Sequence, residues 1–175
     1  FGDQVFTVPG DVVAINDGDP SLDDGTVTDG CQAFAGVTGK IALIDRGACL
    51  FVEKVKNAQD AGAIGAVIVN NVPLDGVFNM GADEGNVIGS TITIPALMVS
   101  LEDGDVIPDQ LALGTVSVAM IGSSSEGRGA WIVMIGAAVN EKNVRYTVSD
   151  CPPCSSTARI ANVWKSDAVG RAGFT

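Results

Sequence analysis

The sequence has no histidine among its 175 residues. Histidine is the usual general base near neutral pH and the commonest zinc ligand in proteins. Its absence excludes a Ser-His-Asp triad and a Cys-His pair, so acid–base chemistry would have to come from carboxylates, lysine or tyrosine. We therefore expect no catalytic residues in this chain, and no metal or cofactor apart from a calcium ion considered below.

Basic residues and long apolar runs are also scarce. The chain has 10 lysines and arginines against 21 acidic residues, which gives a formal net charge of -11. Such a field repels phosphate backbones and anionic lipid surfaces, so we expect no nucleic-acid partner. The longest apolar run, from Trp131 to Val139, is far shorter than the roughly 20 residues that span a bilayer. We therefore expect no membrane insertion.

Aromatic residues make up only 5% of the chain, whereas hydrophobic residues make up 46%. A chain of this length can bury a sizeable core, and this composition makes that core mostly aliphatic. The 22 glycines predict many tight turns between short elements. Residue 1 is Phe rather than Met and no leader-like segment follows it, so we interpret the sequence as a processed or excised piece.

Four cysteines are present, at Cys31, Cys49, Cys151 and Cys154. An even number predicts two disulfides and a secreted or extracellular protein, with buried free thiols as the alternative. A Cys31–Cys49 bond would close a loop of about 18 residues and contribute on the order of 3 kcal/mol. The Cys151-Pro-Pro-Cys154 sequence has redox spacing, but too few residues follow it for a thioredoxin-like sheet. A local structural disulfide, or a pairing with absent chain, is favoured there.

Residues 41–69 predict a strand, a helix and a second strand. Ile41–Ile44 and Ala63–Val69 are continuous apolar runs, as expected of strands that are covered on both faces. Between them, apolar residues recur at helical spacing, at Phe51, Val52, Val55, Ala58 and Ala61. Polar residues, Lys54 among them, fill the opposite helical face, and Gly62 stands where a C-terminal cap is expected. The pattern predicts a right-handed parallel crossover.

Shorter elements are predicted on both sides of this unit. Residues 4–8 and 11–15 indicate a hairpin about Pro9-Gly10. Ser90–Val99 predicts a strand at a sheet edge or with a bulge, because Pro95 interrupts it.

The C-terminal half predicts one more helix and further strands. Ser100 and Asp103 open the helix as a capping box, and Gly104 and Pro108 keep it short or broken. The strands are predicted at Thr115–Ile121, Trp131–Val139 and Val144–Val148.

An acidic, glycine-punctuated loop is predicted from Asn16 to Gly30. Its carboxylates could hold calcium, with Asp17, Asp19, Asp23 and Asp24 as the candidate ligands. Gly18 and Pro20 interrupt the spacing of the known calcium loops, so a solvated acidic loop is the favoured interpretation.

The central block closely resembles the protease-associated (PA) domain family. It reads GKIALIDRGACLFVEKVKNAQDAGAIGAVIVNN, followed by ITIPALMVSLEDGD, and the resemblance covers about Asp29 to Gly122. Its most specific parts are Asp45-Arg46-Gly47-x-Cys49-x-Phe51, Lys54-x-x-Asn57-Ala58-Gln59-x-Ala61-Gly62-Ala63, Asn70-Asn71 and Ile94-Pro95-Ala96. The resemblance supports the Cys31–Cys49 pairing and implies an α/β fold. That fold is a swivelling β/β/α sandwich, with a small barrel-like β core flanked by two short helices.

The domain division follows from the extent of the resemblance. We assign residues 1–129 to the PA-like domain. Residues 130–175 would add a strand pair that completes the domain, plus the Cys-Pro-Pro-Cys tail, or they would form an appendage.

The resemblance also implies a function. PA domains accompany the catalytic domains of secreted peptidases and occur in sorting receptors, where they bind protein substrates or cargo or cover an active site. We therefore expect a non-catalytic interaction module whose partners are a protein or peptide substrate and a catalytic domain of the same precursor. The alternative is a stand-alone receptor-like or cell-surface domain that binds a protein or peptide ligand.

The candidate ligand-binding residues are Arg46, Asn70, Asn71, Asp83 and Glu84, because recognition usually lies in loops on a rigid frame. Arg46 would more simply hold a neighbouring carboxylate or loop carbonyls. The segment Ile92–Ile94 could add an extended peptide to the sheet.

Overall fold

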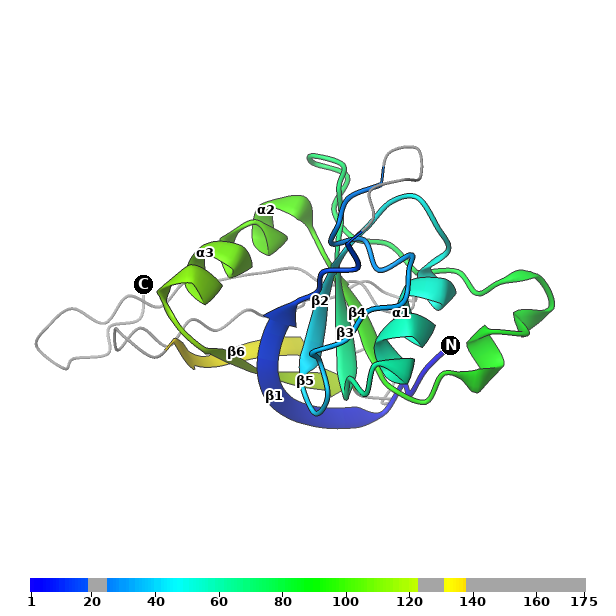
Figure 1. Cartoon of the computed structure of the whole chain (residues 1–175), viewed down its shortest axis with the longest axis horizontal. Helices are drawn as coiled ribbons and strands as arrows, with labels where there is room; N and C mark the ends of the chain where they lie inside the picture. Colours follow the sequence, from blue (N-terminus) through cyan, green and yellow to red (C-terminus); the bar gives the residue numbers. More distant parts are fainter. Residues whose placement is uncertain (19–24, 123–130, 138–175) are drawn as a thin grey trace, which may run out of the picture.

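The computed structural model describes residues 1–18, 25–122 and 131–137 of the chain (Figure 1). In order, its elements are β1 (Phe6–Ala14), β2 (Ile41–Asp45), α1 (Phe51–Asp60), β3 (Gly65–Val69), η1 (Glu84–Asn86), η2 (Gly89–Thr91), β4 (Ala96–Val99), α2 (Leu101–Gly104), α3 (Val106–Leu113), β5 (Val116–Gly122) and β6 (Trp131–Ala137). No helix in the described ranges is long and apolar enough to cross a bilayer.

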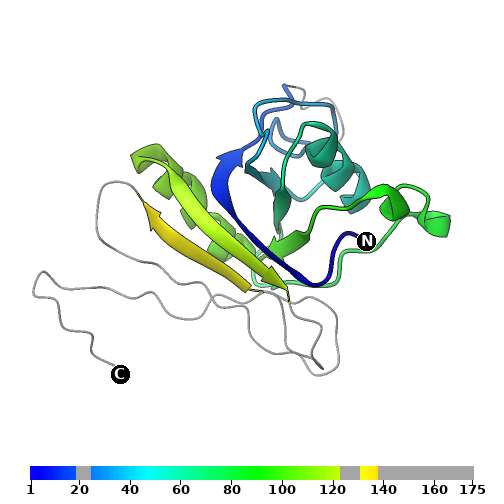
Figure 2. The same cartoon turned by 90° about the horizontal axis from the view of Figure 1, so that it is seen from below.

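One mixed sheet organises the described residues, with the strand order β4-β3-β2-β1-β5-β6. The four strands β4 to β1 run parallel, and β5 and β6 are antiparallel additions. The long strand β1 curls from one part to the other, so the sheet bends into an open, barrel-like shape (Figure 2). The predicted α/β fold, a barrel-like β core flanked by short helices, is confirmed.

Two apolar clusters fill the two sides of the sheet. On one side, α1 contributes Val52, Val55 and Ala58 to a cluster with Ile44 and Ile68. On the other, residues of α2 and α3 pack with strand residues of β2, β3, β4 and β5. The parallel strands are therefore covered on both faces, which explains why their sequences are continuously apolar.

The predicted β2–α1–β3 unit is confirmed. β2 and β3 are parallel and in register from Ile41 opposite Gly65 to Asp45 opposite Val69. The helix ends before Gly62, whose φ of 85° lies in the left-handed region that glycine adopts without strain.

The predicted N-terminal hairpin is wrong, because Phe6–Ala14 is one continuous strand. Its first part pairs antiparallel with β5, from Phe6 to Asp11, and its last part pairs parallel with β2, from Val12 to Ala14. Pro9-Gly10 has turn composition, but long-range pairing on both edges overrides that local preference.

Asp11 stands where β1 changes from one partner strand to the other. Its carboxylate accepts hydrogen bonds from Lys40 Nζ at 2.6 Å and from Ser117 Oγ at 2.7 Å. These contacts, that of Lys40 first, lower the pKa of Asp11.

The segment predicted as a strand at Ser90–Val99 is shorter than expected. Only Ala96–Val99 forms β4, which lies at the edge of the sheet, as Pro95 indicated. Residues 92–94 are not a strand, and the backbone amides of Thr93 and Ile94 donate to Gln59 Oε1 at 2.7 Å and 3.3 Å. The structure therefore offers no open strand edge for peptide addition at Ile92–Ile94.

The predicted second helix is broken, as expected, into α2 and α3. Ser100 caps α2, since its Oγ accepts from the Asp103 amide at 3.2 Å. Pro108 is the third residue of α3, where a backbone N–H would have no partner within the helix.

The last strands agree with the sequence as far as the structure describes them. β5 confirms the predicted strand at Thr115–Ile121, and β6 pairs with it over part of the predicted Trp131–Val139 run. The predicted strand at Val144–Val148 and the Cys151–Cys154 tail lie outside the described residues. The domain division at residue 129 stays a prediction.

Candidate protein-interaction site

Arg46 and Asn70 meet where the parallel strands β2 and β3 end. The Arg46 amide donates to Val69 O at 2.8 Å and the Asn70 amide donates to Val99 O at 2.9 Å, so the sheet itself fixes both residues. Arg46 Nη1 then donates to Asn70 Oδ1 at 2.7 Å. Because parallel strands end at the same edge of a sheet, two residues 24 positions apart form one site.

Arg46 makes two further contacts. Its Nη1 lies 3.5 Å from Asp75 Oδ2, and its guanidinium lies 4.7 Å from the ring centroid of Phe78. Phe78 in turn packs edge-on against Phe51 at the start of α1, with the ring centroids 5.8 Å apart. The guanidinium is thus held on one side by carboxylate and amide oxygens and on the other by an aromatic face.

Asn70 is fully buried and uses its amide in both directions. Its Oδ1 accepts from Arg46 and from the Val72 amide, and its Nδ2 donates to Gly76 O at 2.7 Å. These bonds close the loop formed by residues 71–76, which we call the rim loop.

Leu74 lies at the tip of the rim loop and is 91% exposed. Its φ of 61° is in the left-handed region, which costs a non-glycine residue about 1 kcal/mol. Its amide donates to Glu102 Oε1 of α2 at 2.8 Å, and this hydrogen bond lowers the pKa of Glu102. The rim loop therefore holds an apolar side chain in solvent with contacts at several points along its length.

Acidic residues predominate in the part of the sequence that contains the rim loop. Residues 57–122 contain no lysine or arginine but hold Asp60, Asp75, Asp83, Glu84, Glu102, Asp103, Asp105 and Asp109. Of the lysines and arginines in the described ranges, Lys40, Arg46 and Lys56 are in ion pairs and Lys54 is fully buried. Of these carboxylates, Asp75 belongs to the rim loop and pairs with Arg46, and Glu102 accepts from the Leu74 amide.

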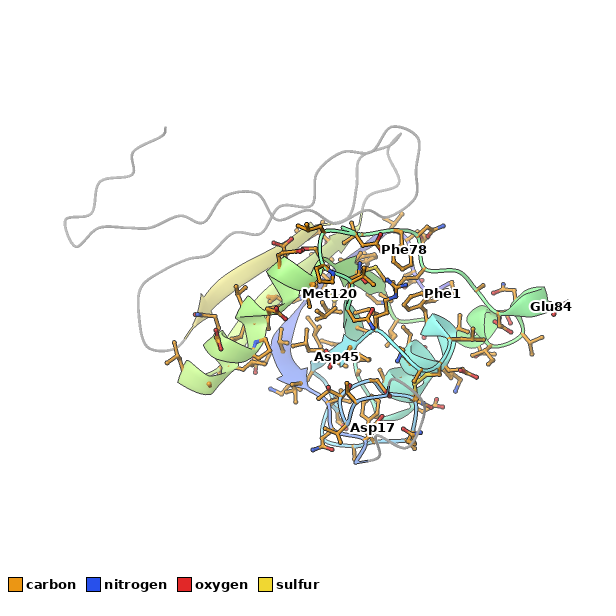
Figure 3. The ribbon with its side chains drawn as sticks, turned by 90° about the horizontal axis from the view of Figure 1, so that it is seen from above. Phe1, Asp17, Asp45, Phe78, Glu84 and Met120 are labelled. Atoms are coloured by element: carbon orange, nitrogen blue, oxygen red, sulfur yellow. A yellow bond between two sulfur atoms is a disulfide. The ribbon has the colours of Figure 1, made fainter. Side chains whose placement is uncertain are left out.

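The other candidate binding residues are Asn71, Asp83 and Glu84, and only Asn71 belongs to the rim loop. Asn71 is exposed on the rim loop, next to Asn70. Asp83 accepts from the amides of Val87, Ile88 and Gly89, and these bonds, that of Gly89 first, lower its pKa. Glu84 lies at the end of a protruding loop, well away from Phe78 (Figure 3). Ligand binding by any of the candidates stays a prediction.

The Cys31–Cys49 disulfide is present, as the sequence and the family resemblance predicted. It ties the segment before β2 to the turn that follows it. Cys151 and Cys154 lie outside the described residues.

The calcium hypothesis stays a prediction. Asp17 accepts from the Gln32 amide at 3.4 Å, and its other oxygen is buried without a hydrogen-bond partner in the part of the chain described. Asp19, Asp23 and Asp24 lie outside the described residues. Within the described ranges, no three acidic or cysteine side chains cluster in a way that could hold a metal ion.

Sequence reasoning singled out Arg46 and Asn70 but missed Leu74 and Glu102. The available signal for Leu74 was an apolar residue between Pro73 and Asp75 in a loop of turn-forming residues. The hydrogen bond from the Leu74 amide to Glu102 could not be predicted, because the two residues are 28 positions apart in the sequence.

Parts of this chain are similar in sequence to known proteins. The PA domain family matches residues 8–107. The chain is 37% identical over 106 residues to the minor extracellular protease Vpr of Bacillus subtilis, covering 59% of this chain and 12% of that protein. It is 41% identical over 111 residues to leucine aminopeptidase 2 of Trichophyton equinum, covering 60% of this chain and 21% of that protein.

Two further proteins are also similar to part of this chain. An ER degradation-enhancing alpha-mannosidase-like protein 3 from Xenopus laevis is 36% identical over 83 residues, covering 43% of this chain and 8% of that protein. The solved aminopeptidase from Aneurinibacillus sp. strain AM-1 is 26% identical, with a TM-score of 0.46, over 75% of this chain and 27% of that one. The chain therefore spans a quarter or less of the length of these curated relatives. Since the family match covers more than half of the residues, the chain belongs to the PA domain family.

Proposed function

We propose that this chain is the non-catalytic interaction module of a secreted multidomain peptidase. It binds and positions protein substrate, or covers the active site of a catalytic domain in the same precursor. The relatives named as a protease and an aminopeptidase, of which the chain matches only a part, support this proposal. The lack of histidine supports a module without catalytic chemistry of its own.

The rim loop is the observation that carries the proposal. Arg46, Asn70 and Glu102 contact different residues of this loop, Asp75, Gly76 and Leu74 respectively, while the Leu74 side chain stays almost fully exposed. An exposed apolar side chain on a pre-formed loop can be buried against a partner with little ordering cost. The carboxylates of Asp75 and Glu102 beside Leu74 favour a partner with lysine or arginine side chains.

The stand-alone receptor-like domain remains the second candidate. The match to a mannosidase-like protein supports only the part of it that needs no peptidase, because that relative is not named as one. Reading the full-length coding sequence separates the two, since only the first candidate requires a peptidase domain in the same chain.

Kinetics on the full-length protein test the role of the rim loop. We would replace Leu74 by Asn, a residue that tolerates the left-handed backbone, and compare turnover of casein with turnover of a short chromogenic peptide. A substrate-positioning module predicts about a tenfold loss of kcat/KM for casein alone, the effect of one anchor contact of about 1.4 kcal/mol. A module that covers the active site predicts faster turnover of the short peptide.

Leu113→Asn is the matched control, since Leu113 is 64% exposed but lies at the far end of α3. It should leave both substrates unaffected. If Leu74→Asn also leaves both unaffected while the variant stays folded, the rim loop is not the contact and the proposal is wrong in this form.

A further inference from the structure

A buried lysine lies against the disulfide. The Lys54 side chain is 0% exposed, and its Nζ donates to Asp29 O at 2.5 Å and to Cys31 Sγ at 3.3 Å. It forms no ion pair with a carboxylate of the described residues. Burial lowers the pKa of Lys54.

The sequence pattern placed Lys54 on the exposed face of α1, and the structure corrects that prediction. The chain before β2 covers this part of the helix, where Asn57 Nδ2 also donates to Gly30 O at 2.9 Å. A buried ammonium is costly unless it finds a strong partner. The carboxylates of Asp29, Asp17, Asp45 and Glu53 favour its charged form from a distance, but the atoms that its Nζ touches, a carbonyl oxygen and a disulfide sulfur, are neutral. A thiolate at Cys31 would give the ammonium a negative charge in direct contact.

The two sulfur atoms of the disulfide have different surroundings. Cys31 follows the buried residues Asp29 and Gly30 and contacts Lys54. Cys49 lies between Ala48 and Leu50, which are both exposed. Both cysteines are half-buried, so exposure alone does not select one sulfur. Attack at Cys49 is favoured because it places the departing negative charge on Cys31, the sulfur that contacts the lysine.

We propose that the Cys31–Cys49 disulfide is a thiol-exchange site, at which a low-molecular-weight thiol forms a mixed disulfide with Cys49 and Cys31 leaves as a thiolate held by Lys54. The attacking thiolate forms a bond to Cys49 Sγ, the bond between Cys49 Sγ and Cys31 Sγ breaks, and its electron pair stays on Cys31 Sγ. A second thiolate then attacks the sulfur of the bound small thiol and releases Cys49. In total two small thiols are oxidised to their disulfide and the protein disulfide is reduced.

Opening this bond would act on the rim loop through Arg46. The turn from Arg46 to Cys49 contains Ala48 with φ 58°, and the Cys49 amide donates to Gly47 O at 2.7 Å. The disulfide anchors the end of this turn, three residues from the guanidinium that contacts Asn70 and Asp75. The exchange chemistry itself does not depend on the proposed interaction function.

The test treats the full 175-residue chain with 2-mercaptoethanol. This neutral thiol is chosen because the net charge of -11 would slow an anionic thiol such as glutathione. Samples are quenched with acid, alkylated and mapped by mass spectrometry, which assigns each cysteine separately. We expect the early mixed disulfide at Cys49 and the alkyl group at Cys31.

Two variants assign the role of the lysine. Lys54→Met removes the ammonium at similar volume. We expect exchange about tenfold slower, because Cys31 would then leave without a cation beside its sulfur. Lys56→Met is the control, because Lys56 lies on the same helix and pairs with Asp60 at the surface. It should exchange at the wild-type rate.

Three outcomes would overturn the proposal: a mixed disulfide mainly at Cys31, a bond inert to the thiol, or a Lys54→Met protein that exchanges as fast as wild type. The position of the mixed disulfide is measured on the wild-type chain alone. The proposal thus remains testable even if Lys54→Met does not fold.

Discussion

Glu102 accepts a hydrogen bond from the backbone amide of Leu74 at 2.8 Å and so couples α2 to the rim loop. The carboxylate comes from the first turn of α2, and the amide belongs to the residue with the most exposed large apolar side chain in the described residues. The contact fixes the backbone of Leu74 and leaves its side chain free. The rim loop is in this way held by Asn70, which follows β3, and by Glu102 of α2.

The rim loop should open in acid. The Leu74 hydrogen bond lowers the pKa of Glu102, so the folded loop prefers the ionised carboxylate. Its contribution is fully present above the ordinary glutamate pKa and is lost as the pH falls through the lowered value. We expect hydrogen exchange at the Leu74 amide, corrected for its intrinsic pH dependence, to speed up in that range.

A Glu102→Gln variant is the control for this pH effect. The glutamine oxygen can still accept the hydrogen bond but does not titrate there. Exchange at Leu74 that keeps the same acid transition in this variant would show that another group controls the loop.

Asn70→Asp tests whether both polar ends of the buried amide are needed. The carboxylate can still accept from Arg46 and Val72, but it has no N–H for Gly76 O. We expect a loss of about 1–3 kcal/mol in the free energy of unfolding, the cost of a buried unsatisfied acceptor. Urea denaturation measures it.

Asn71→Asp, on the exposed neighbour, is the matched substitution and should change stability by less than about 0.5 kcal/mol. Equal effects at the two positions would contradict the role given to the Asn70 amide.

Gly104→Ala tests the packing of α2 on β3. A Cβ at this position would lie 2.1 Å from Val69 Cγ1, so helix and strand must move apart. We expect a loss of about 1–3 kcal/mol, the usual cost of overpacking. Because α2 carries Glu102, exchange at the Leu74 amide should also increase.

The double variant Gly104→Ala/Val69→Ala is the control, because Val69→Ala removes the methyl groups that the new Cβ would meet. Its loss of unfolding free energy should be smaller than the sum of the losses in the two single variants. Additive losses would mean that the contact between Gly104 and Val69 does not limit the position of α2.

The β2–α1–β3 unit could be predicted from sequence because its signals are local. Continuous apolar runs mark strands buried on both faces, and the apolar spacing of α1 marks the side that faces the sheet. The arrangement of Arg46 and Asn70 follows, since parallel strands end at one edge.

The features that the sequence could not supply depend on distant segments. Pro9-Gly10 predicts a turn, yet β1 continues because β5, more than 100 residues later, pairs with it. Lys54 lies at a polar helical position, yet the chain before β2 covers it. Local patterns carry no information on which remote segment will cover a residue.

Hydrogen–deuterium exchange of the full-length protein, inactivated in its catalytic domain, tests the interaction function most directly. The isolated 175-residue chain would be compared with the full-length protein, alone and with casein bound. We expect slower exchange at residues 71–76 upon contact with the catalytic domain or the substrate, and unchanged exchange at residues 83–91. Slower exchange confined to residues 83–91, or none at all, would contradict the assignment of the rim loop as the contact surface.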